Sequence, residues 1–109
     1  MSVISDENIK SIVEAMLGVL NKGGKDLAAY AQAEAAKFAH SIEMIVSLKL
    51  AGQIDEQEAT LQLNLQKAAA RVVLTAVEGI TILIAEQALN AGLQAVADIV
   101  NKAIGFTLI

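Results

Sequence analysis

The sequence predicts an all-α protein that completes its hydrophobic core by packing against copies of itself. The chain has no proline to interrupt a helix, and only one tyrosine and two phenylalanines among the aromatic residues that strands favour. Hydrophobic residues recur at spacings of three and four along most of the chain, as amphipathic helices require. They make up 55% of the 109 residues and charged residues 18%, whereas soluble domains average about 45–50% and about 25%.

This apolar excess predicts an interface. A chain of this length is expected to form a single helical domain over residues 1–109. Such a domain buries only about two-thirds of the surface of its unfolded chain, so the apolar residues cannot all lie inside a monomer. The remainder would face a second copy, another protein or a lipid. We expect the partner to be the chain itself, most simply as a two-fold dimer.

The first helix is predicted over residues 5–21. Ser5 is a good N-cap residue, and Asp6 and Glu7 place negative charge in the first turn, where the helix dipole favours it. Gly23 is expected to help end this helix.

The second and third helices are predicted over residues 25–51 and 55–104. Gly52 ends the second helix, whose middle is rich in alanine. The third opens with a capping box, in which Asp55 and Glu58 cap each other's backbone N–H groups.

The third helix is predicted to be long and central. One narrow polar stripe follows it at helical spacing, and the other sides are apolar; the stripe comprises Asn64, Lys67, Arg71, Thr75, Glu78, Glu86, Asn90, Gln94, Asp98 and Asn101. About 50 residues would span roughly 75 Å, too long for the first two helices to cover on every side. The alternative is a break near Gly92 that gives a short fourth helix. We favour continuity because the apolar stripes keep phase through Gly92, and we interpret Gly79 and Gly92 as close helix contacts or a slight bend.

In this interpretation the third helices of two copies pair. The residues expected at the oligomer interface lie along one side of the third helix: Val73, Leu74, Val77, Ile84, Ala88, Ala91 and Ile99.

No motif predicts catalysis, so we expect no enzyme activity, no catalytic residue and no cofactor. His40 is the single histidine and Glu43 follows one turn later, but di-iron bundles use the order Glu-x-x-His on two helices. We interpret His40 as a surface or interface residue and expect no metal ligand. Arg71, Glu78 and Glu86 are interpreted as part of a solvated edge; alternatively, they are buried polar groups that fix the register of an oligomer.

Charge and hydropathy argue against nucleic acid and membranes as partners. The net charge is −4, which argues against nucleic acid and anionic membranes. The apolar run from Val72 to Ala85 is interrupted by Glu78 and is too short to span a bilayer. The N-terminal residues lack a secretory signal, so we expect a cytoplasmic protein.

The sequence therefore predicts a non-enzymatic structural or adaptor protein that acts by oligomerising. Small, acidic, apolar-rich helical proteins of this composition occur among phage structural and accessory proteins. The alternatives are a membrane-active helical protein and a helical bundle that binds a metal or a small ligand.

Overall fold

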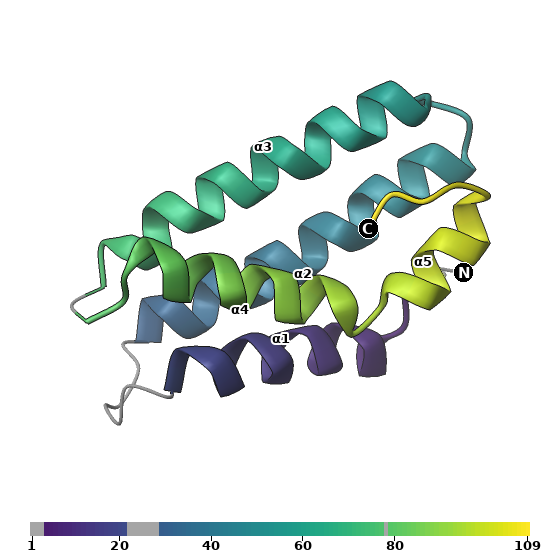
Figure 1. The fold of residues 1–109 in the computed structure, drawn as a ribbon. Helices are drawn as coiled ribbons and strands as arrows, with labels where there is room; N and C mark the ends of the chain where they lie inside the picture. The colour runs from purple at the N-terminus through teal and green to yellow at the C-terminus, as the bar shows by residue number, and fades with distance from the viewer. Residues whose placement is uncertain (1–3, 22–28, 78) are drawn as a thin grey trace.

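A computed structural model describes residues 4–21, 29–77 and 79–109 (Figure 1). Within them the chain is all-helical and forms five helices and no strand: α1 (Asp6–Leu20), α2 (Ala29–Leu50), α3 (Glu56–Thr75), α4 (Ile82–Gln94) and α5 (Ala97–Ile104). The radius of gyration is 13.6 Å, as expected for a compact chain of this length. The all-α fold class predicted from the sequence is confirmed.

The first four helices pack in a ring that is nearly open on one side. α1 packs most extensively against α4 and also against α2, whose other side packs against α3. α3 and α4 touch much less: they meet near the turn that joins them and diverge toward the other end, where α5 and the C-terminal residues lie (Figure 1). α3 is therefore an edge helix of the bundle.

Local capping signals place the starts of α1 and α3 as predicted. The Oγ of Ser5 accepts a hydrogen bond from the Asn8 N–H at 3.2 Å, and the Asn8 Oδ1 accepts one from the Ser5 N–H at 3.0 Å. The same reciprocal arrangement joins Asp55 and Glu58, at 2.7 and 3.1 Å. Each box satisfies N–H groups that a helix start leaves without an intrahelical partner.

The second helix ends one residue before its predicted end, at Leu50. Its predicted start at residue 25, and Gly23 before it, lie outside the described residues, and the described part of α2 begins at Ala29.

The prediction of one helix over residues 55–104 is wrong, because α3, α4 and α5 occupy this range. α3 ends at Thr75, and Gly79 then takes a φ of 90°, a conformation that glycine adopts without steric cost. Thr81 starts α4 as an N-cap, with its Oγ1 accepting from the Ile84 N–H at 3.2 Å. The chain therefore turns back at Gly79, and the longest dimension of the molecule is 42 Å.

The break between α4 and α5 does not lie near Gly92, where the alternative prediction placed it. α4 continues through Gly92 to Gln94, and α5 begins after Val96, whose φ of −127° and ψ of 7° are not helical. Gly92 is instead a close helix contact: a Cβ built on it would lie 2.8 Å from the Cγ of Met16 and 3.2 Å from the Cγ2 of Ile12. The absence of a side chain at Gly92 lets α4 approach α1.

The core lies within this single chain and is closed at one end by the C-terminal residues. Phe106, Leu108 and Ile109 pack against the buried cluster. Asn101 of α5 holds them: its Oδ1 accepts from the N–H groups of Leu108 at 2.9 Å and Ile109 at 3.1 Å, and its Nδ2 donates to the Ile109 carbonyl at 3.1 Å. The C-terminal segment thus folds back onto the bundle.

Candidate self-association surface

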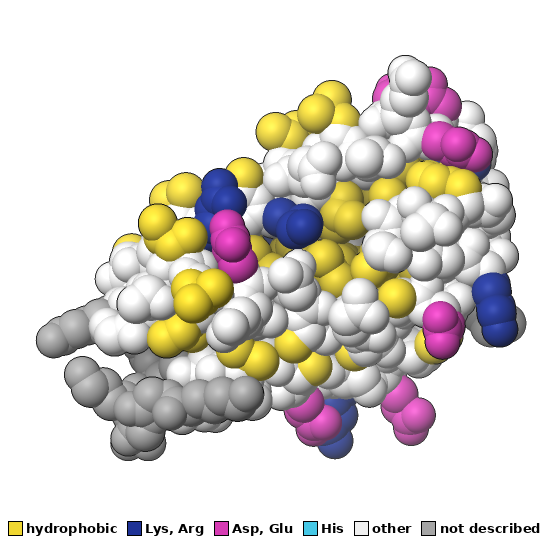
Figure 2. All heavy atoms as spheres, viewed as in Figure 1, with side chains coloured by type: hydrophobic (Ala, Val, Ile, Leu, Met, Phe, Trp, Pro, Cys, Tyr) yellow, Lys and Arg dark blue, Asp and Glu magenta, His cyan; other side chains and the backbone are white. Residues whose placement is uncertain are grey.

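Large hydrophobic side chains remain exposed on the described part of the chain, and several lie on α3 and the start of α4. They are Met44, Leu50, Leu61, Leu65, Val72, Ile82, Leu83 and Ile99. Figure 2 shows hydrophobic side chains along the edge that α3 forms and near the end of the molecule where α3 and α4 are joined. Scattered apolar residues on a surface are ordinary, but residues aligned on one helix face suggest an interaction site.

Leu61, Leu65, Ala68 and Val72 form one continuous line on α3, which we call the outer stripe. Successive residues of an α-helix are rotated by about 100°, so these four positions fall within an arc of roughly 60°. The side chains of Leu61, Leu65 and Val72 are 59%, 58% and 69% exposed. Their spacing of four, three and four residues matches alternate d and a positions of a coiled-coil heptad.

The opposite side of α3 already has a partner. Ala59, Leu63, Ala70 and Leu74 are buried, and α2 is the helix against which α3 packs most extensively. α3 is therefore apolar on two opposite sides, of which the chain itself covers one. The monomer's core does not require leucine at positions 61 and 65, since both side chains point away from it.

The polar stripe predicted on the third helix is divided between helices in the structure. On α3 it borders the narrow space between α3 and α4, where Lys67 and Arg71 line a small hollow with Glu86, Leu89 and Asn90. The Nη1 of Arg71 lies 3.1 Å from the Oε1 of Glu86, and the two side chains are 44% and 48% exposed. Such an exposed pair contributes only about 0.2–1 kcal/mol to stability. Glu78 lies outside the described residues.

A second exposed apolar site follows the turn between α3 and α4. Ile82 and Leu83 occupy the first turn of α4 and are 63% and 64% exposed. They follow the N-cap Thr81, so the turn geometry sets their position.

Of the seven interface residues predicted from the sequence, two are buried, four are half-buried and one is exposed. Leu74 and Ala88 are fully buried, Val77 and Ile84 pack partly buried against the core, and Val73 and Ala91 are half-buried. Ile99, on α5, is 41% exposed. While this fold is kept, Leu74 and Ala88 cannot contact a second copy. The spacing of Leu61, Leu65 and Val72 was the feature of the sequence that could have indicated the outer stripe.

His40 and Glu43 lie together on an exposed part of α2. The Nδ1 of His40 is 3.5 Å from the Oε1 of Glu43, and the His40 side chain is 62% exposed. Beside them the Oγ of Ser41 donates a hydrogen bond to the Phe38 carbonyl at 2.6 Å. Within residues 4–21, 29–77 and 79–109, no group of three or more histidine, aspartate or glutamate side chains is placed to hold a metal ion.

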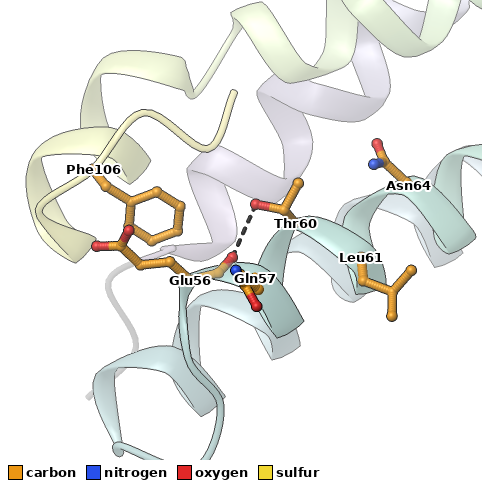
Figure 3. A pocket seen from close by; sticks show the side chains of 6 residues that line it. All are labelled: Glu56, Gln57, Thr60, Leu61, Asn64 and Phe106. Atoms are coloured by element: carbon orange, nitrogen blue, oxygen red, sulfur yellow. Dashed lines mark hydrogen bonds between the residues drawn. The ribbon is translucent and has the colours of Figure 1, made fainter.

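An open hollow of about 440 Å³ lies between the N-terminal part of α3 and the C-terminal segment. Figure 3 shows the Phe106 ring on one side of it and Thr60 of α3 on the other, with the Glu56 side chain extending toward the ring. The Thr60 hydroxyl donates a hydrogen bond to the Glu56 carbonyl at 2.9 Å. The Nζ of Lys49 lies 5.8 Å from the centroid of the Phe106 ring, within the range of a cation–π contact. The hollow adjoins the outer stripe at Leu61.

Among the helices in the described part of the chain, none is both long enough and apolar enough to cross a membrane. Comparisons of this chain with protein-family models, with curated proteins and with solved structures found no significant match.

Proposed function

We propose that this protein is a non-enzymatic self-association module, a structural or adaptor protein whose activity is the assembly that it forms. The observation that supports this proposal is the two-sided apolar character of α3. Its inner face is buried, and the three large side chains of its outer stripe are exposed. A second copy, packed along the outer stripe, would remove from water the apolar side chains that the chain leaves uncovered.

The energetics favour a weak, concentration-dependent assembly. Burying a leucine or valine completely contributes about 1.5–3 kcal/mol, and the three large side chains of the outer stripe are 58–69% exposed. Each therefore offers about 1–2 kcal/mol, so two copies together offer about 6–12 kcal/mol. Association costs about 4–15 kcal/mol in lost translational and rotational freedom. The two quantities are similar in size, so the dimer should dissociate on dilution.

The test is the mass in solution of the chain and of surface variants, measured by light scattering after size-exclusion chromatography. We expect the unmodified chain to give a multiple of 11.4 kDa. Leu65→Lys and Val72→Lys should each shift it to the monomer at the same concentration, because a lysine in the stripe would lose hydration on association.

Ser11→Lys is the control with the same change of charge, since Ser11 is exposed on α1, a helix that packs against α4 and α2. Its mass should equal that of the unmodified chain. Ile99→Lys distinguishes the outer stripe from the interface predicted from the sequence, to which Ile99 belongs. If Ile99→Lys yields monomers while Leu65→Lys does not, the assembly uses α5 and the outer stripe is the wrong surface.

A further inference from the structure

We propose that the hollow between α3 and α4 binds a small carboxylate that carries an apolar group. The hollow has a volume of about 230 Å³ and is lined by Lys67, Arg71, Glu86, Leu89 and Asn90. This site does not depend on the proposed self-association, because all its lining residues belong to one chain and none is part of the outer stripe.

The two helices present their polar side chains to the hollow in facing pairs. Lys67 and Arg71 are one turn apart on α3, and Glu86 and Asn90 are one turn apart on α4. The two helices run in opposite directions from the turn that joins them (Figure 1). The Nη1 of Arg71 lies 3.1 Å from the Oε1 of Glu86, so one turn further along each helix Lys67 lies across the hollow from Asn90.

The pair of Lys67 and Asn90 lacks a negative charge. The asparagine amide is neutral, and within the described residues Lys67 forms no ion pair. The hollow as a whole has two cationic side chains and one carboxylate, which leaves one positive charge in excess. A monoanion held between Lys67 and Asn90 would neutralise that charge, and it would take the place that a second acidic side chain on α4 would fill.

The donors and the floor of the hollow indicate which anion fits. Ammonium, guanidinium and amide groups all donate hydrogen bonds to a carboxylate, and the guanidinium of Arg71 has further N–H groups besides the one directed at Glu86. Leu89 is only 2% exposed and closes the hollow on the side of the core. Figure 2 shows hydrophobic side chains in the hollowed strip between α3 and α4. Such a floor favours an anion with a hydrocarbon group over a strongly hydrated inorganic anion.

The volume of the hollow sets the size of the ligand. A water molecule takes up about 30 Å³ of the liquid, so the hollow has room for roughly eight non-hydrogen atoms. Hexanoate is a carboxylate of this size and is the probe for the test. Hexanol has the same hydrocarbon chain without the charge, and sulfate has charge without the chain.

The experiment is a titration of isotope-labelled protein with hexanoate at constant ionic strength, followed by NMR. We expect saturable shifts of the Asn90 side-chain amide and of the Lys67 ε-methylene group, with a millimolar Kd because the polar groups of the hollow remain in contact with water. Hexanol and sulfate should each bind about fivefold more weakly or worse, because each lacks one of the two features that the hollow recognises.

Two substitutions test the site from its two sides. Lys67→Gln removes the positive charge and should weaken hexanoate binding by about fivefold or more. Asn90→Asp introduces a carboxylate at the position of the ligand's own and should weaken binding as much. Without hexanoate, Asn90→Asp should also melt at a higher temperature than the unmodified chain, and high salt should remove this increase.

Gln87→Glu is the control for the added negative charge, because Gln87 is exposed on α4 and does not line the hollow. It should bind hexanoate as the unmodified chain does. The absence of saturable shifts, or equal shifts with hexanol, would overturn the carboxylate site. Unchanged binding by both Lys67→Gln and Asn90→Asp would place the bound hexanoate outside the hollow and would overturn it as well.

Discussion

Replacing Gly92 with alanine tests the packing of α4 on α1, the helix pair with the most extensive contact in the described part of the chain. The added Cβ would lie 2.8 Å from the Cγ and 3.1 Å from the Sδ of Met16, and 3.2 Å from the Cγ2 of Ile12. Real Cβ atoms essentially never approach a neighbour to less than 3.0 Å. The Met16 side chain must therefore move, and it is fully buried, so it has little room to do so.

The expected cost follows from two opposing effects. Adding a methyl group to a well-packed core costs about 1–3 kcal/mol. Replacing glycine with alanine inside a helix returns about 0.5–1 kcal/mol. The net destabilisation should be about 1 kcal/mol, which lowers the Tm of a domain of this size by about 4–8 °C.

Gly18→Ala is the matched control. Gly18 is an exposed residue of α1, and a Cβ built on it meets no atom within 4 Å. This variant should be more stable than the unmodified chain by up to about 1 kcal/mol. Because the helix-propensity effect is similar in both variants, their difference isolates the packing cost, about 1–3 kcal/mol.

The assay is thermal and urea unfolding followed by circular dichroism, with all three proteins at the same concentration so that association affects them equally. If Gly92→Ala is as stable as Gly18→Ala, the close contact between Gly92 and α1 does not exist. The folding back of α4 onto α1 would then be refuted.

Three further predictions concern two single side chains and one ion pair. Thr81→Ala should destabilise the fold by about 1 kcal/mol in urea unfolding, because the Ile84 N–H loses its capping partner; an unchanged midpoint would place the start of α4 elsewhere. Asn101→Ala removes three hydrogen bonds to the C-terminal residues, so limited proteolysis with carboxypeptidase should trim this variant at least several-fold faster than the unmodified chain, and equal rates would contradict this role. A double-mutant cycle on Arg71 and Glu86 should give a coupling below about 1 kcal/mol that weakens further in high salt; a larger coupling would mean that the pair is buried by another surface.

Local chemistry determined the parts of the fold that could be predicted. The caps at Ser5 and Asp55 depend on side chains three residues apart, so their geometry follows from the sequence without knowledge of the rest of the fold. The identity of α1 and of the described part of α2 follows likewise from the spacing of their apolar residues.

The turn between α3 and α4 could not be predicted from the apolar pattern alone. The segments before and after Gly79 are rich in apolar residues because α3 and α4 each bury a face in the same core, so the helical periodicity continues across the break. Thr81 carried the relevant signal, but no glutamate or glutamine follows at the third helical position to complete a capping box. A lone threonine before an apolar run is a weak marker of a helix start.

The candidate surface depends on the same turn. With one long helix, the apolar positions around Leu74 and Ala88 would be left for a second copy. Because α4 folds back, the chain itself buries them, and the apolar positions that stay exposed on α3 are Leu61, Leu65 and Val72. The apolar excess of the sequence predicts that some surface remains uncovered, but the neighbours of each helix determine which.

The measurement that tests the central claim most directly is sedimentation velocity of the unmodified chain from low micromolar to several hundred micromolar. We expect a species of twice 11.4 kDa at high concentration that dissociates reversibly on dilution, with Val72→Lys remaining monomeric throughout. A single species at 11.4 kDa across the whole range would contradict the claim that the outer stripe of α3 pairs with a second copy.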